Sequence, residues 1–296
     1  MKISDIQDFP DTAFNIRQNG KSLKRQTTEN VDIVTKLDKP GIDIRVKNNT
    51  KNETIYIPVL LTDSGMVDVV YNDFYIGDNA DVVIIAGCGI HNCSNENSQH
   101  DGIHSFFLGE NSKVKYIEKH YGEGDGSGKK ILNPQTNVDL KRGSSLEMQT
   151  IQIKGVDSTV RQTIANLSDN TNFSVSEKIM THGNQEAKTI FRVTLNGDNS
   201  STKVTSRAVA QDTSKQEFIS YIQGNAKCFG HVECDAIIMD SATVRAIPEI
   251  LANNVDARLI HEAVIGKIAG EQVVKLMTLG LDEKQAEKEI INGFLK

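Results

Sequence analysis

The sequence has no tryptophan, only 5% aromatic residues and no excess of basic residues: 33 Lys and Arg stand against 39 Asp and Glu, a net charge of −6. Proteins that bind nucleic acids neutralise phosphates with a basic surface and commonly stack bases on aromatic rings. Both features are missing. We therefore expect no nucleic-acid partner, and an aromatic platform for sugars is equally unsupported.

Long apolar runs and disulfide-forming cysteines are also scarce. The longest nearly uncharged apolar run covers only residues 82–90, whereas a membrane-spanning helix needs about 20 residues. The opening MKISDIQDFPD lacks the basic and apolar segments of a secretory signal. Four cysteines are too few for a disulfide scaffold. We expect a soluble, cytoplasmic protein without membrane contact, whose reduced thiols are free to bind metal or sulfur.

A loose internal repeat begins near residue 76. Short alternating strands are separated by turns of Gly or Ser, an acid, Asn and a small residue, whereas residues 1–75 are mixed and polar, with strands predicted at 54–61 and 66–71. The turns recur at uneven steps, at Gly77, Gly109, Gly143, Ser168, Gly197 and Gly224. This loose period predicts a mainly β fold with a stacked parallel β-helix over 76–258. An antiparallel sandwich of long strands is the alternative on pattern alone.

The last region, 259–296, begins with a strand and changes character to helical. The sequence predicts two helices, over 269–279 and 282–295, with Gly280 ending the first and Asp282 capping the second. An apolar stripe follows the second helix through Ala286, Ile290, Ile291 and Phe294. Such short helices are marginal alone, so they must pack either on the sheet of this chain or on a partner.

The glycine-rich segment GEGDGSGKK at 122–130 does not fit a nucleotide-binding loop. A Walker loop needs Gly at the position of Glu123 and Ser or Thr at that of Lys130. The segment is predicted to be a flexible surface loop. Any ATP hydrolysis associated with this protein is therefore expected to come from another chain.

Two segments concentrate residues that bind metals. The first, 88–104, contains Cys88, His91, Cys93, His100 and His104. Its spacing differs from that of structural zinc sites, and a polar turn is favoured over a metal site. The second group, spread over 228–239 and 259–272, contains Cys228, His231, Cys234, His261 and Glu262. Thiolate, imidazole and carboxylate together suit iron or an iron–sulfur cluster. Because His231 and Cys234 should face opposite sides of a strand, a labile or shared site is expected.

These segments resemble the SufB/SufD family, the scaffold proteins of the SUF system for iron–sulfur cluster assembly. The resemblance covers about residues 80–296 and rests on YIEKHYGEG (116–124), GVDSTVRQT (155–163), SRAVAQDTSKQEF (206–218), GNAKCFGHVECDAI (224–237) and LIHEAVIGKIAGEQVVKLMTLGL (259–281). It implies a right-handed parallel β-helix followed by a small helical domain. It also implies a non-enzymatic scaffold for a labile cluster of the 4Fe–4S type.

The resemblance further implies a site and partners. The family's functional cysteine falls on Cys234 and its His–Glu pair on His261 and Glu262, whereas Cys88, Cys93 and Cys228 have no secure counterpart and remain weaker metal-ligand candidates. The implied partners are a SufC-like ABC-type ATPase on the C-terminal helices, a sulfur donor and apo-protein acceptors. The chain looks like the compact scaffold of a minimal two-component system, a homodimer whose last strands pair.

Two other classes compete with this interpretation. A zinc-binding interaction module would rest on residues 88–104, and a polysaccharide-active enzyme could use a parallel β-helix. Metal analysis separates them: one zinc per chain favours the module, no metal leaves the enzyme open, and iron with acid-labile sulfide favours the scaffold.

Overall fold

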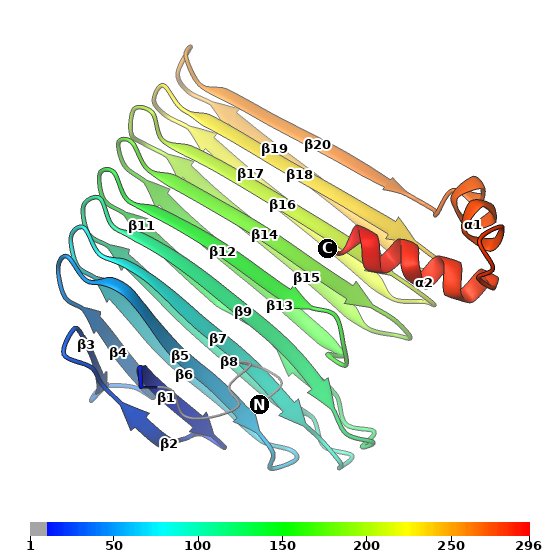
Figure 1. Cartoon of the computed structure of the whole chain (residues 1–296), viewed down its shortest axis with the longest axis horizontal. Helices are drawn as coiled ribbons and strands as arrows, with labels where there is room; N and C mark the ends of the chain where they lie inside the picture. The colour runs from blue at the N-terminus through cyan, green and yellow to red at the C-terminus, as the bar shows by residue number, and fades with distance from the viewer. Residues whose placement is uncertain (1–10) are drawn as a thin grey trace.

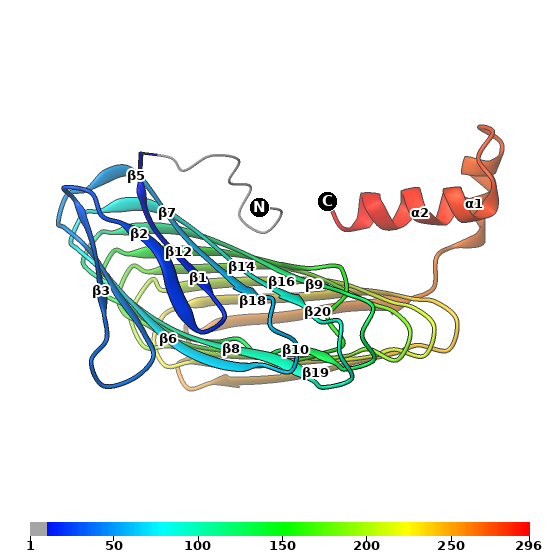
Figure 2. The ribbon, with the colours of Figure 1, turned by 90° about the horizontal axis from the view of Figure 1, so that it is seen from below.

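The structure is a computed structural model that describes residues 11–296. Two ten-stranded sheets face each other as two layers (Figure 1, Figure 2). Sheet A runs in the order β2 (Lys21–Gln26), β1 (Ala13–Gln18), β5 (Lys51–Leu61), β7 (Asp81–His91), β9 (Lys113–Glu123), β12 (Ser145–Gln152), β14 (Asn172–Thr181), β16 (Ser201–Ala210), β18 (Phe229–Ile238) and β20 (Arg258–Gly266).

Sheet B also consists mainly of parallel strands. It runs in the order β19 (Thr243–Ala252), β17 (Lys215–Gly224), β15 (Glu186–Leu195), β13 (Ser158–Leu167), β10 (Lys130–Leu132), β8 (Ser98–Leu108), β6 (Val67–Ile76), β4 (Gly41–Val46) and β3 (Val31–Thr35), and β11 (Gln135–Leu140) also lies between β13 and β8. Successive strands from β4 to β9 alternate between the sheets and pair in parallel within them. The fold is a mainly β solenoid of about eight turns, which confirms the predicted parallel β-helix.

The register explains the irregular repeat in the sequence. Val82 of β7 pairs with Val114 of β9, whereas Phe173 of β14 pairs with Thr202 of β16 after a slightly shorter stretch of chain. Each step is one turn of the solenoid. The pairing crosses residues 75 and 258 without a break, because β5 and β6 on one side and β20 on the other belong to the same sheets. The strands predicted at 54–61 and 66–71 are β5 and β6, and the three-part domain division stays a prediction.

Asparagine recurs in the turns because one corner of the solenoid needs a left-handed backbone. The φ angles there are 56°, 56°, 57° and 58° at Asn79, Asn111, Asn170 and Asn199. Asn tolerates this region better than most residues with a side chain. The amide of Asn79 donates to the carbonyl of Glu110 in the next turn at 2.8 Å, and the other three asparagines make the same kind of bond. The corners therefore stack as a hydrogen-bonded ladder.

The core fills the space between the sheets. In most strands inward buried residues alternate with outward, more exposed ones, as in β14 and β15. Phe74 and Phe106 stack inside with ring centroids 4.4 Å apart, and Tyr116 meets them edge-on. Removing one such aromatic side chain costs about 3–5 kcal/mol in a packed core.

Both predicted helices are present, as α1 (Gly270–Met277) and α2 (Glu283–Phe294). Asp282 and Gln285 form a reciprocal capping box at the start of α2. Figure 2 shows α2 running back over the outer side of sheet A, where Lys178 donates to the carbonyl of Lys296 at 2.6 Å and Arg207 to that of Phe294 at 3.2 Å.

The two helices differ in how much apolar surface they bury. Ala286 and Ile291 of α2 are buried, whereas α1 buries no residue and leaves Val274 exposed. The second helix thus packs partly on this chain, and the first keeps an uncovered apolar face. Within residues 11–296, neither helix has the length and apolar character required to cross a membrane.

Candidate functional site

Strand β18 directs Cys234 into the solenoid. Val232, Cys234 and Ala236 are buried in alternation, and His231, just before them, is only half-buried. This confirms the sequence-based expectation that His231 and Cys234 face opposite sides of one strand.

Strand β20 adds the predicted His–Glu pair and divides it between two faces. His261 pairs in register with the inward Val232, and Ala263 pairs with Cys234, so the imidazole and the thiol belong to the same inner face. Glu262 lies on the other face, where its Oε2 is 3.3 Å from His231 Nε2. The structure therefore places Cys234 and His261 on the same inner face of neighbouring strands and brings His231 into contact with Glu262 on the other face.

The two ring nitrogens of the half-buried His261 lack a hydrogen-bond partner among residues 11–296. Neither ring nitrogen forms a hydrogen bond within the described part of the chain, although both are shielded from solvent. Burial lowers the pKa of His261, and the nearby His231 lowers it further, which favours the neutral imidazole that binds metals. A buried polar group without a partner is costly. Such a ring is suited to a ligand supplied from outside the chain.

Cys234 is held as a neutral thiol. Burial, followed by the charges of Glu177 and Asp235, raises its pKa to about 12. Iron binds the thiolate, so loading this cysteine must release a proton. The inner face thus offers a neutral imidazole and a protonated thiol, which can become ligands of an incoming cation.

A row of polar side chains leads along the interior to Cys234. Its members are successive register partners on five strands of sheet A: Glu118, Thr150, Glu177, Ser206 and Cys234. Ser206 donates to Glu177 at 3.0 Å. Burial would raise the pKa of Glu118, but His120, His104 and Arg161 outweigh that effect and hold it well below its usual value. The sequence did not reveal this row, because its members lie on successive turns of the solenoid.

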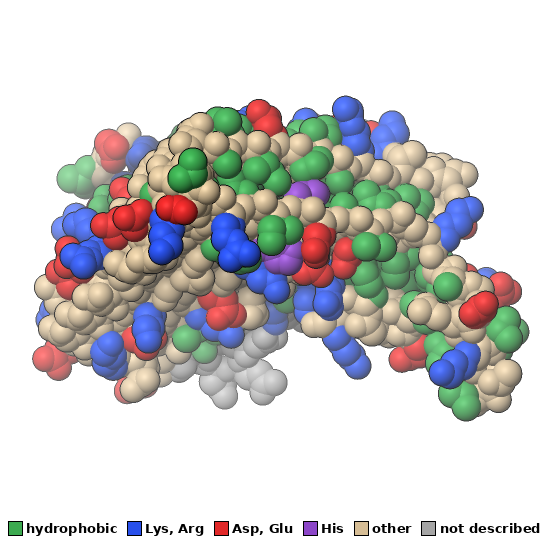
Figure 3. Space-filling model, turned by 90° about the horizontal axis from the view of Figure 1, so that it is seen from above, with side chains coloured by type: hydrophobic (Ala, Val, Ile, Leu, Met, Phe, Trp, Pro, Cys, Tyr) green, Lys and Arg blue, Asp and Glu red, His purple; other side chains and the backbone are tan. Residues whose placement is uncertain are grey.

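The last turn of the solenoid is open. Apolar side chains are exposed on both of its strands, namely Ile250 and Leu251 of β19 and Ile260, Val264 and Ile265 of β20. Figure 3 looks onto this end and shows hydrophobic side chains spread across it, with histidine and acidic side chains near the middle. Strand β20 is the last in sheet A, so its outer backbone groups have no strand to pair with among residues 11–296.

The 88–104 segment does not form one cluster. Cys88, His100 and His104 are buried, whereas His91 and Cys93 lie at an exposed edge. Cys228 is buried in the turn before β18. Across residues 11–296, no three His, Cys, Asp or Glu side chains are grouped as a preformed metal site.

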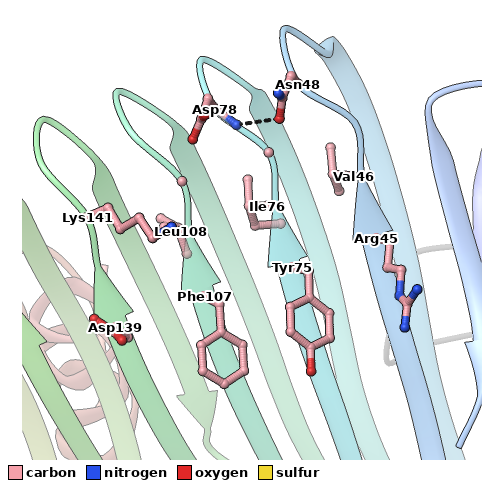
Figure 4. Close-up of a pocket in the computed structure, with 12 residues that line it drawn as sticks. Arg45, Val46, Asn48, Tyr75, Ile76, Asp78, Phe107, Leu108, Asp139 and Lys141 are labelled. Carbon is pink, nitrogen blue, oxygen red and sulfur yellow. Dashed lines mark hydrogen bonds between the residues drawn. The ribbon is translucent and has the colours of Figure 1, made fainter.

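A shallow cavity of about 310 Å³ lies on the outer side of sheet B, far along the solenoid from Cys234 (Figure 4). The exposed rings of Tyr75 and Phe107 stack there with centroids 5.2 Å apart, and the Arg45 guanidinium lies 5.8 Å from the Tyr75 ring. The sequence alone does not reveal this aromatic pair, because its members lie on successive turns and meet only through the register of β6 and β8.

The fold and site define a class: a β-solenoid with an inward thiol on β18 and an inward imidazole on the neighbouring edge strand β20. The family model described as "SUF system FeS cluster assembly, SufBD core domain" matches residues 61–294. The chain belongs to the SufBD family of iron–sulfur cluster assembly proteins, as its motifs predicted.

Several relatives support the same conclusion. An iron-sulfur cluster assembly SufBD family protein of Methanocaldococcus jannaschii is 30% identical over 198 residues, which are 64% of this chain and 60% of that protein. One from Pyrococcus horikoshii is 27% identical over 86% of this chain and 82% of its own length. The iron-sulfur cluster assembly protein SufB of Bacillus subtilis is 33% identical over 33% of this chain and 22% of its own. The chain spans about 60% of the length of the first of these relatives.

Proposed function

We propose that this protein is a non-enzymatic scaffold on which a labile iron–sulfur cluster of the 4Fe–4S type is assembled and from which it is handed on. The observation that carries the proposal is His261: its two ring nitrogens are buried and unpartnered on the face that also presents Cys234. A neutral imidazole and a thiol are ligands that iron accepts.

Two copies of the chain are proposed to complete the site. One thiol and one imidazole cannot saturate a cluster, and no strand of the described residues covers the outer edge of β20, which a second β20 could pair with. The exposed Ile260 and Val264 would then be covered. Strand β19 is less suited to pairing, because Pro248 interrupts its backbone donors.

Glu262 is proposed to become an iron ligand only after strand β20 moves. It lies on the outer face with His231, so it can reach the cluster face only when β20 shifts. A SufC-like ABC-type ATPase that binds α1 and α2 would supply that shift through its different affinity for two scaffold states. The uncovered apolar face of α1, with Val274 exposed, supports a docking role. A carboxylate would hold iron less tightly than a thiolate.

The remaining parts of the proposal follow from the family. A sulfur donor and apo-protein acceptors would act before and after assembly, in the cytoplasm. The rival zinc module would need the residues of 88–104 to meet. The described structure instead divides them between the interior and an exposed edge.

The experiment is anaerobic reconstitution with iron and sulfide after co-expression with the ATPase. We expect Cys234→Ser and His261→Asn to lose most of the visible absorption of the cluster while circular dichroism stays unchanged. Cys88→Ser, which removes another buried thiol several turns away, is the matched control and should reconstitute normally. Undiminished absorption in Cys234→Ser would overturn the assignment, and one zinc per chain would favour the zinc module.

A further inference from the structure

Cys93 differs from the other three cysteines of the chain. Cys88, Cys228 and Cys234 are buried, and burial raises the pKa of each thiol. Cys93 is exposed. Because thiolate formation and access together control cysteine reactivity, the three buried thiols are protected and Cys93 is open to reagents in solution.

Cys93 lies beside a histidine, and a carboxylate lies close to the other ring nitrogen of that histidine. Its Sγ is 3.0 Å from His91 Nε2, and His91 Nδ1 is 3.5 Å from Glu123 Oε1. His91 is the last residue of β7, and Cys93 lies in the loop that follows it. Glu123 is the last residue of the neighbouring β9 and pairs in register with His91. A thiol, a base and a group that orients the base form the arrangement used to activate nucleophiles.

The loop that carries Cys93 is held in place on both sides. The Cys93 amide donates to Ser64 Oγ at 2.9 Å, and the fully buried Asn92 donates to the carbonyls of Glu96 at 2.8 Å and Gly128 at 3.2 Å. Supporting bonds of this kind fix the geometry of a reactive group.

The glycine-rich segment 122–130 packs closely against the loop that carries Cys93. Gly126 and Gly128 lie against the Cys93 loop so closely that a Cβ on either would clash with the carbonyl of Ser94 or Glu96. Their amides donate to the carbonyls of Asn92 and Ser94 at 3.1 and 2.9 Å. These two glycines are needed because two loops stack there.

We propose that Cys93, His91 and Glu123 form a nucleophilic thiol site that attacks the sulfur–sulfur bond of small disulfides. His91 Nε2 accepts the Cys93 proton, and Sγ attacks one sulfur of the disulfide. The sulfur–sulfur bond breaks, a mixed disulfide forms on Cys93, and the departing thiolate takes the proton from His91. No other oxidant or reductant is needed. The site is independent of the proposed cluster assembly, because it contains neither Cys234 nor His261.

The test follows the reaction of the reduced full-length chain with 5,5′-dithiobis(2-nitrobenzoic acid) through the release of the coloured thiolate. We expect one fast equivalent per chain, absent in Cys93→Ser and retained in Cys88→Ser. His91→Gln, which keeps a hydrogen-bonding side chain but not a base, should slow the fast phase on the order of tenfold, since positioned bases contribute up to ~10²–10⁴. Mass spectrometry with oxidised glutathione should locate the mixed disulfide on Cys93.

Glu123 is a positioning residue, and a double-mutant cycle tests it. Glu123→Gln should slow the wild-type chain but have no further effect on His91→Gln, because it acts through that ring. A fast phase that survives Cys93→Ser, or a rate unchanged in His91→Gln, would overturn the proposal. Additive effects of the two substitutions would remove Glu123 from the site.

Discussion

The two ends of the solenoid differ in how they are finished. At the first turn, β2 and β3 pair antiparallel with β1 and β4, and inward residues such as Ala13 and Val31 are buried. At the last turn, the inward Ile250 and Ile265 are still 43% and 37% exposed. Edge strand β2 also carries Lys21, Lys24 and Arg25 among its exposed or half-buried residues, and charged edges discourage strand pairing.

The difference shows that the first turn is closed by antiparallel strands, whereas the last turn leaves an edge strand and apolar side chains exposed. A solenoid must protect its edge strands from aggregation, and this chain does so at one end with reversed, charged strands. The other end keeps a straight parallel edge and an apolar rim, directly beside Cys234 and His261. The same comparison supports pairing of two copies through β20.

The largest effect that we expect comes from placing a charged residue on the edge strand at each end of the solenoid. Val264 of β20 and Leu23 of β2 are 70% and 65% exposed, so they form a matched pair. We expect Val264→Lys to convert the proposed dimer to monomers, because a two-fold interface contains every substitution twice and a buried unpaired charge costs several kcal/mol. Leu23→Lys should leave the dimer intact. Sedimentation measures both, and a Val264→Lys dimer of unchanged affinity contradicts the proposed pairing.

The pH dependence of stability tests the buried histidine in the middle of the solenoid. Burial lowers the pKa of His104 to about 4, despite the opposing charge of Glu118. Its ordinary value is about 6.5, so between pH 6.5 and 4 the unfolded chain binds the extra proton. The free energy of unfolding should therefore fall as the pH drops through this window, by up to about 3 kcal/mol.

Urea unfolding at several pH values measures this dependence. His104→Gln, which cannot titrate, is expected to be less stable at pH 7 but to lose the slope in this window. Below pH 4.5 a second loss follows, because the pKa of Glu118 is also depressed in the folded chain. A wild-type slope that persists in His104→Gln would assign the acid sensitivity to other groups.

The smallest expected effect concerns the helices beyond the open end. Asp282→Ala removes the capping box of α2 and should destabilise that helix by about 1 kcal/mol. The last turn of the solenoid should be unaffected. Hydrogen exchange of residues 283–294, compared with that of β18, measures the effect. Asp282→Asn, which keeps a capping side chain, should restore most of the protection.

Much of the fold was predictable because its signals are local. Alternation identified the strands, the turn spacing identified the solenoid, and Gly280 and Asp282 marked the helix boundaries. The pattern before residue 76 was weaker, because β2 and β3 pair antiparallel with β1 and β4 and lie outside the repeating parallel turns. The sequence therefore concealed that β5 and β6 continue both sheets.

The site was only partly predictable, because its contacts depend on register. Alternation alone separated His231 from Cys234, but the division of His261 from Glu262 followed only once β20 was aligned with β18. Glu123 reaches His91 from the next turn of the solenoid, and the sequence offered no sign of that contact. The ligand assignments of Cys234, His261 and Glu262 stay predictions until reconstitution tests them.

The asparagine corner ladder bears on how such a protein can change length over evolution. Each corner makes the same amide-to-carbonyl bond to the coil above it, whatever that coil's other residues are. Duplicating or deleting a whole coil therefore leaves every remaining corner satisfied. The number of turns in the solenoid can therefore change by whole turns, while the first turn and the last turn keep their own sequence requirements.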